Sequence, residues 1–190
     1  MEIEILKAKM TGVVPLLMKN GRAGDPSNEW AIRMKAITDA MKGTPSLELA
    51  LELERVKWEA SIYHNGAEPV IPADNVLAMI ISGSKLLRLG PKVKAGVSTL
   101  AQEFPLLYKG PRSIEELWAS GAFADRRMVR INRAPIVQVR PRFNSWALEI
   151  ELYVQTKIID LKKVLTCLTK AGEQCGICDY RPRFGRFVVE

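Results

Sequence analysis

The sequence predicts an α+β fold, and three patterns support this. Residues 146–154 alternate apolar and polar side chains, as in a strand with one buried face. Residues 158–171 repeat apolar side chains at helical spacing, and Asp74 is expected to cap a second strong helix. Residues 128–140 are interpreted as one strand, with a hairpin that turns at Asn132-Arg133 as the alternative. With further strands at 2–10 and 184–189, the order becomes strand, helix, strand, strand, helix, strand. This is the βαββαβ order of a ferredoxin-like, RRM-like antiparallel sheet, here with helical insertions and with helices 74–88 and 158–171 expected on one face.

The segments between these elements are interpreted as insertions within a single domain of residues 1–190. A helical insertion is expected at about residues 20–66. It contains one helix capped by Ser27 or Asn28 and a second capped by Ser46. A loop insertion is expected at about residues 98–125, with an extended piece and a short helix.

The positive charge of the chain is unevenly distributed. The formal net charge is +7 over 190 residues. Residues 1–70 contain nine Lys/Arg and ten Asp/Glu, whereas residues 71–190 contain nineteen and eleven. An excess confined to one part of a chain suggests a polyanionic partner, although a solvated basic face gives the same totals. The chain shows neither an apolar run of membrane-spanning length nor a signal-peptide pattern, so we expect no membrane partner and a cytoplasmic location.

Three basic segments are candidates for contact with nucleic acid. The first lies between Asn75 and Gln102, where there is no acid. The second, from Arg126 to Arg142, contains six arginines and no acid. The third is the basic ending of the chain, where Gly176 and Gly185 bracket a segment that contains Tyr180. Their candidate residues are Lys85, Arg88, Lys92 and Lys94; Arg126, Arg127, Arg130, Arg133, Arg140 and Arg142; and Tyr180, Arg181, Arg183 and Arg186. Arginines alternating along a strand can contact successive phosphates, and an aromatic ring can stack on a base. Phe187 is expected in the core, whereas both a stacking and a packing role remain open for Tyr180.

The sequence shows no catalytic motif, and we expect no enzyme, no cofactor and no metal site. There is no phosphate-binding glycine loop, and the single histidine, His64, is expected to end a helix. Cys175 and Cys178 have the spacing of half a zinc site, but no second pair exists. A metal-independent nuclease that uses Tyr, Lys and His64 remains a minor alternative.

Several motifs occur in the order seen in a widespread family of uncharacterised phage and prophage proteins, which this chain resembles over nearly its whole length. They are PLLM near the start, Val70 to Asn75, Ser84-Lys85 with Lys94 to Val97, Phe104-Pro105-Leu106, Tyr108 to Pro111, Arg140 to Trp146, and Gly176 to Phe187. The family has a glycine where this chain has Cys178. The resemblance implies a phage context, a location in the host-cell cytoplasm, and single-stranded DNA of replication or recombination as the ligand.

A more distant similarity is to the RAMP superfamily, the RNA-binding backbone subunits of CRISPR effector complexes. It is based on Ile71-Pro72 with the helix that follows, and on Gly176 to Arg186. It implies single-strand binding by a filament of identical subunits. The main alternative is a phage interaction protein that inhibits or remodels a host complex such as a defence system. The sequence does not distinguish DNA from RNA, because recognition of the 2′-hydroxyl leaves no motif.

Overall fold

The computed structural model describes residues 2–131 and 134–190 and has an α+β fold with antiparallel sheets. A single domain was expected, but the contacts divide the chain into two compact units. Unit 1 comprises Met1–Leu16, Glu68–Lys109 and Phe143–Glu190, and unit 2 comprises Leu17–Ala67 and Gly110–Arg142. Unit 2 therefore contains the predicted helical insertion together with a later segment of the chain.

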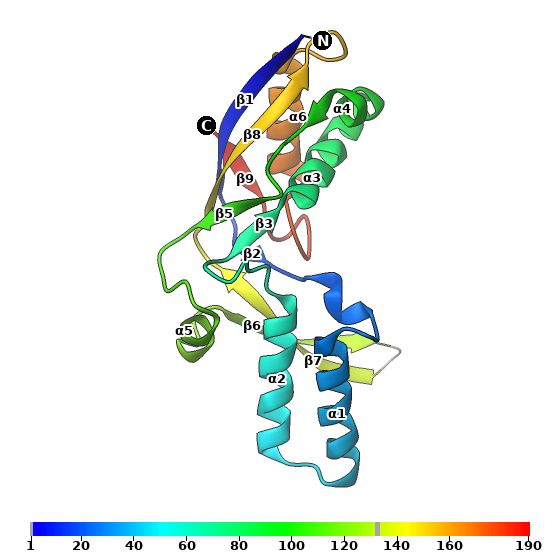
Figure 1. The fold of residues 1–190 in the computed structure, drawn as a ribbon, viewed down its shortest axis with the longest axis vertical. Helices are drawn as coiled ribbons and strands as arrows, with labels where there is room; N and C mark the ends of the chain where they lie inside the picture. Colours follow the sequence, from blue (N-terminus) through cyan, green and yellow to red (C-terminus); the bar gives the residue numbers. More distant parts are fainter. Residues whose placement is uncertain (1, 132–133) are drawn as a thin grey trace. The chain divides into compact units, whose positions relative to one another are not determined.

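Unit 1 contains an antiparallel sheet with helices on one face (Figure 1). Its elements are β1 (Ile3–Gly12), β3 (Val70–Pro72), α3 (Ala73–Leu86), α4 (Gly90–Gly96), β4 (Val97–Ser98), β5 (Glu103–Leu107), β8 (Ala147–Gln155), α6 (Leu161–Lys170), a single π-turn (Ala171–Cys175) and β9 (Phe187–Val189). The strand order is β3-β5-β8-β1-β9, and β4 pairs with β8 beyond the end of β5. The central pair, β1 and β8, runs in unbroken register from Ile3–Gln155 to Thr11–Ala147.

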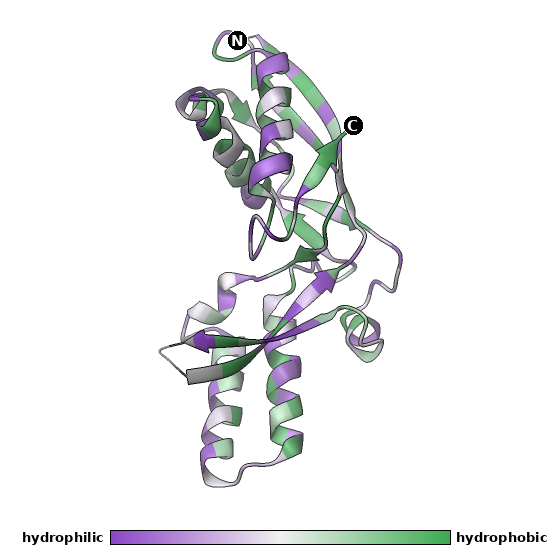
Figure 2. Ribbon diagram, turned by 180° about the vertical axis from the view of Figure 1, so that it is seen from behind, coloured by the Kyte–Doolittle hydropathy of each residue, from purple (hydrophilic) through white to green (hydrophobic). Residues whose placement is uncertain are grey.

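The core of unit 1 lies between the sheet and the helices. The predicted alternation in β8 is confirmed: Leu148, Ile150, Leu152 and Val154 are buried on the helix face. The helices α3 and α6 lie close together because Gly83 has no side chain, and a Cβ there would lie 2.4 Å from the backbone oxygen of Cys167. The outer face of α6 is polar (Figure 2).

Unit 2 consists of a helical hairpin, a small sheet and a short helix. Its elements are a 3₁₀ turn (Gly21–Gly24), α1 (Glu29–Gly43), α2 (Leu47–Ser61), α5 (Ile114–Ala119), β6 (Ala124–Ile131) and β7 (Ala134–Phe143). The strand order in the sheet is β2-β7-β6, where β2 is Leu16–Leu17. The buried Trp58 is central to this unit, because its indole nitrogen donates to the carbonyl oxygen of Phe123 at 2.8 Å and its ring lies 5.6 Å from that of Trp118.

Two predictions about the sheet are wrong. Residues 128–140 are not part of the sheet of unit 1, because they belong to the β6–β7 hairpin of the other sheet. Residues 98–125 are not only a loop insertion, since β5 lies within them and pairs with β8. Both errors have one cause. Pro105 lies at the centre of β5 and lowers its strand propensity, so the run after Arg126, which is rich in β-branched residues, gives the stronger strand prediction. The last strand is also shorter than the predicted 184–189.

The helix caps predicted at Asn28 and Ser46 are confirmed, whereas the cap predicted at Asp74 is wrong, because Pro72 precedes α3 and no side chain caps this helix. Asn28 accepts a hydrogen bond from the Trp30 backbone nitrogen at 3.1 Å, and Ser46 accepts one from that of Leu49 at 3.1 Å. The basic loop expected after Lys85 is partly helical, because Gly90-Pro91 begins α4 instead of only ending the preceding helix. Among the described residues, no helix combines the length and apolarity required to cross a membrane.

Candidate nucleic-acid interface

The first basic group lies at the carboxyl end of α3 and on α4, and we call it the α3–α4 group. It consists of the exposed residues Lys85, Arg88, Lys92 and Lys94. Arg88 adopts a left-handed backbone conformation (φ 57°) that ends the helix. Gly96 brings α4 against the turn after β8, where a Cβ would lie 3.0 Å from the Ile158 side chain. The exposed Lys157 in that turn therefore lies next to this end of α4, a neighbour that the sequence alone did not indicate.

The second group lies on the loop between the π-turn and β9, residues 176–186, which we call the C-terminal loop. Gly176 (φ 73°) and Gly185 (φ 74°) form its neck. There the Ile177 nitrogen donates to the Gly185 oxygen at 2.9 Å, and the Gly185 nitrogen donates to the Pro15 oxygen at 2.9 Å. A Cβ on Gly185 would lie 2.0 Å from the Ile177 oxygen, so only glycine permits this approach. The loop is thus held to the body of unit 1 by backbone hydrogen bonds.

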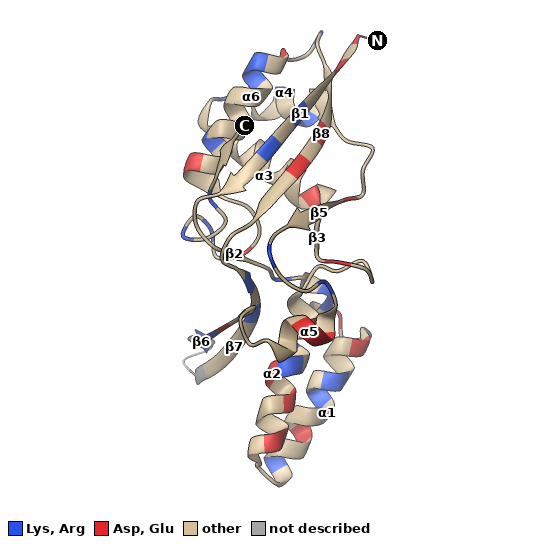
Figure 3. Cartoon of the chain, turned by 90° about the vertical axis from the view of Figure 1, so that its left-hand side faces the viewer, with Lys and Arg blue, Asp and Glu red and all other residues tan. Residues whose placement is uncertain are grey.

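The aromatic residues of this ending differ in burial. Phe187 is 2% exposed and Phe184 is 6% exposed, and the prediction that Phe187 belongs to the core is confirmed. Tyr180 is 44% exposed, with its ring edge-on to Phe184 at 5.9 Å between centroids. The arginines at 181, 183 and 186 are all exposed. The loop therefore presents one accessible ring among three guanidinium groups. The arginine positions of the loop are blue in Figure 3.

Cys178 has a backbone conformation that is uncommon for residues other than glycine. Its φ is 65°, in the left-handed region that favours glycine. Burial raises the pKa of the Cys178 thiol to about 12, although the amide nitrogen of Asn75 lies 3.9 Å from the sulfur. Burial also raises the pKa of Cys175. Across residues 2–131 and 134–190, no group of His, Cys, Asp and Glu side chains has the arrangement of a metal site.

The two groups in unit 1 lie toward opposite ends of α3. The C-terminal loop contacts Asn75 near the start of the helix, and Lys85 lies ten residues further along. At 1.5 Å per residue this corresponds to about 15 Å. Lys162 on the polar outer face of the neighbouring α6 is exposed, and it is a further candidate that the sequence did not single out.

The arginines of β6 and β7 lie in unit 2, and several of them contact acids. The buried Asp125 pairs with Arg127 at 3.0 Å and with Arg142 at 3.4 Å. Arg140 is directly opposite Asp125 in the strand register and is itself buried. Arg140 is thus buried, and the partly exposed Arg127 and Arg142 pair with a buried carboxylate, so the three are not a row of open phosphate contacts.

The other arginines of this segment differ from one another. Arg126 pairs with Glu54 at 2.8 Å and lies 5.4 Å from the centre of the Trp118 ring, so it links β6 to α2 and α5. Arg130 is exposed. Arg133 lies outside the described residues. The sequence could not reveal this division, because Asp125, one residue before the run, and Glu54 become partners only in three dimensions.

His64 has a structural environment. Its Nδ1 accepts a hydrogen bond from the Gly66 nitrogen at 2.9 Å, and its Nε2 lies 2.8 Å from the Arg112 oxygen. This arrangement makes Nε2 the protonated nitrogen, donating to the carbonyl. Both ring nitrogens thus bond to the backbone.

Comparison with protein-family models and with curated proteins finds no match to this chain.

Proposed function

We propose that the protein is a non-enzymatic, single-stranded nucleic-acid-binding protein that associates with itself along its ligand. The phage resemblance favours single-stranded DNA in replication or recombination over RNA. The observation that carries the proposal is the exposure of Tyr180 among Arg181, Arg183 and Arg186, on a loop whose other aromatic ring, that of Phe184, is buried. An accessible ring among fixed cations suits base stacking combined with phosphate contact.

The fold of unit 1 supports this proposal. We infer that it is a variant of the ferredoxin-like fold, with β1, α3, β5, β8, α6 and β9 as its six elements. In that assignment the sheet order reads second, third, first and fourth strand, with both helices on one face. The α3–α4 group and the C-terminal loop then lie on one helix layer, and a bound strand would run between them past Lys162.

The proposal is tested by fluorescence anisotropy with matched single-stranded DNA, single-stranded RNA and duplex. Tyr180→Ala is expected to lose about 1–3 kcal/mol of single-strand affinity, the usual range for one stacked base. Tyr180→Phe is the matched control, because it retains the ring and should bind like the wild type. Normal affinity of Tyr180→Ala would remove the loop from the interface.

Salt dependence separates contacting cations from structural ones. Replacing Lys92 and Lys94 by Ala should lower the slope of log affinity against log salt by about 1.4, since each single-strand phosphate contact contributes about 0.7. Arg130→Ala tests the exposed arginine of unit 2 in the same way. Arg140 is unsuitable for this experiment because it is buried, and its replacement is expected to affect stability. An unchanged slope in the double lysine variant would show that α4 faces away from the ligand.

The alternative of a protein that acts on a host complex is favoured by the surface of the helical hairpin. Ile32 on α1 and Leu47 and Leu51 on α2 are 57%, 75% and 52% exposed. Exposed apolar residues on neighbouring helices are typical of protein-binding surfaces. A complex of fixed stoichiometry with a host protein, abolished by Leu51→Glu but unaffected by Tyr180→Ala, would favour this function over nucleic-acid binding.

A further inference from the structure

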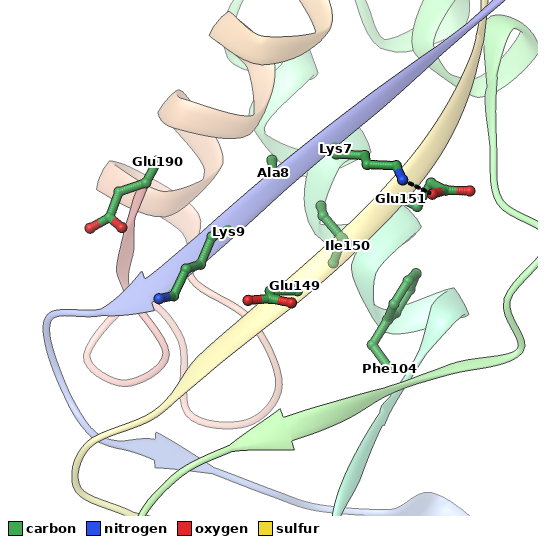
Figure 4. A pocket seen from close by; sticks show the side chains of 8 residues that line it. All are labelled: Lys7, Ala8, Lys9, Phe104, Glu149, Ile150, Glu151 and Glu190. Carbon is green, nitrogen blue, oxygen red and sulfur yellow. Dashed lines mark ion pairs between the residues drawn. The ribbon is translucent and has the colours of Figure 1, made fainter.

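The sheet of unit 1 has a second face, opposite α3 and α6, which we call the open face. In β1 and β8 every second side chain points to it, and the register fixes their neighbours: Ile5 with Tyr153, Lys7 with Glu151, and Lys9 with Glu149. Figure 4 shows the lysines and glutamates in front of the sheet with the helices behind it. Residues of this face line a hollow of about 450 Å³.

The open face combines charged and apolar side chains. Lys7 pairs with Glu151 at 3.1 Å, and the Tyr153 hydroxyl donates to Glu151 at 2.9 Å. On this face Ile3 is 48% and Ile5 50% exposed at one end, and Leu107 is 37% and Val188 47% exposed at the other. Exposed apolar side chains grouped on one face indicate a surface that is covered in an assembly.

This surface does not suit a polyanion. Its lysines, Lys7 and Lys9, stand beside Glu149, Glu151 and Glu190. Its Tyr153 hydroxyl is bonded to a carboxylate, so a phosphate near that ring would meet like charge. Single-stranded nucleic acid is therefore an unfavourable occupant of the open face.

The face is complementary to itself. A two-fold axis parallel to the strands, passing between β1 and β8, places β1 of one copy over β8 of the other at the same level. Lys7 then lies over Glu151 of the other copy, Lys9 over Glu149, and Ile5 over Tyr153. The row formed by Val188, Thr11, Ala147 and Leu107 is reversed by the same rotation, so Val188 meets Leu107.

We propose that the open face is a homodimer interface in which two copies pack sheet against sheet, the lysine row of β1 in each copy facing the glutamate row of β8 in the other. Aligned packing of twisted sheets at about 30° allows this contact over the central rows. β1, β8, β5 and β9 contain 10, 9, 5 and 3 residues. With strands about 4.8 Å apart and a rise of about 3.4 Å per residue, they cover about 440 Å² per copy. Two copies bury about 900 Å², which is below the size of a standard interface, so the dimer is expected to be weak and to depend on protein concentration. It forms without nucleic acid, and so it can fail or succeed independently of the proposed function.

The proposal is tested by measuring the dimer affinity of the full chain by analytical ultracentrifugation, in variants that reverse the charges of the lysine row or of the glutamate row. Lys7→Glu/Lys9→Glu makes the face negative, and Glu149→Lys/Glu151→Lys makes it positive. Each variant alone should dimerise at least about tenfold more weakly than the wild type, because like rows then face each other. An equimolar mixture of the two should form a one-to-one heterodimer with affinity near that of the wild type. The control Glu48→Lys/Glu52→Lys lies on exposed positions of α2 in unit 2. It changes the net charge as Glu149→Lys/Glu151→Lys does and should not alter dimerisation.

The quadruple variant, which carries all four reversals, covers the case in which one row variant fails to fold. It keeps opposite charges within and between copies and should dimerise like the wild type. A monomeric wild type would overturn the proposal, as would dimerisation unaffected by the row variants. So would a quadruple variant that folds but stays monomeric, or row variants that fold alone but do not combine.

Discussion

The glycine neck of the C-terminal loop gives a prediction whose size can be worked out from the structure. Gly185→Ala forces a side chain into the left-handed region at φ 74°, which costs about 1–2 kcal/mol. The new Cβ also meets the Ile177 oxygen, so the two backbones must separate. Separation breaks the hydrogen bonds of Ile177 with Gly185 and of Gly185 with Pro15, each worth about 1 kcal/mol. The expected total is about 3–4 kcal/mol.

A matched control isolates the contact from the backbone conformation. Gly121 also has a positive φ, 66°, but no atom lies within 4 Å of the place of its Cβ. Gly121→Ala therefore carries the conformational cost alone, about 1–2 kcal/mol.

Hydrogen exchange of the full chain, resolved by segment, measures both substitutions. In Gly185→Ala the amides of residues 176–187 should exchange roughly a hundredfold or more faster, since 1.4 kcal/mol corresponds to a factor of ten. In Gly121→Ala only the segment around residue 121 should change, and by less. If Gly185→Ala accelerated exchange around residue 185 no more than Gly121→Ala accelerates it around residue 121, the close contact at the neck would be refuted. If the protein binds single strands as proposed, Gly185→Ala should also weaken that binding, although Tyr180 itself is unchanged.

Three further predictions concern the core, the arginine cluster and a thiol. Phe187→Ala should lower the free energy of unfolding by about 3–5 kcal/mol in urea denaturation, whereas the adjacent exposed Val188→Ala should change it little; similar losses would contradict the burial of Phe187. Asp125→Ala should lower the free energy of unfolding by about 2–3 kcal/mol in fluorescence-monitored unfolding, less than the loss of a fully buried ion pair, because the side chains of Arg127 and Arg142 are 26% and 35% exposed. A variant as stable as the wild type would show that Asp125 does not stabilise these arginines. Because burial raises the pKa of Cys178 to about 12, little of its thiol is ionised at pH 8.5, and alkylation of Cys178 at that pH should be far slower than alkylation of an exposed cysteine. Alkylation as fast as that of an exposed cysteine would indicate that the C-terminal loop opens.

Local patterns predicted the elements but not their pairing. The alternation in β8, the amphipathic α6 and the caps at Asn28 and Ser46 are local signals, and each was found as predicted. The sheet partner of β8 is a tertiary property. Residues 103–107 pair with it although Pro105 interrupts their pattern, because β3 and β8 complete the ladder on either side.

The candidate site divides in the same way. The exposure of the α3–α4 group followed from a stretch without nearby acids in sequence. The same expectation of exposed arginines failed in β6 and β7. Glu54, far away in sequence, pairs with Arg126, and Asp125, just before the run, pairs across the hairpin with Arg142. A run of basic residues therefore predicts an open cationic surface only where the fold brings no acid to it, and the fold is not visible in the sequence.

Burial and pairing identify which cations can act on a ligand. Arg140 is buried, and Arg127 and Arg142 pair with the buried carboxylate of Asp125, so a phosphate bound to either of these two would compete with Asp125. Removing a buried partner from an arginine is costly, so such an exchange is unfavourable. Arg181, Arg183 and Lys92 are exposed and require no such displacement. If the protein binds single strands, the salt dependence should therefore arise from the helix layer of unit 1, although the arginine run of unit 2 is the most basic stretch of the chain.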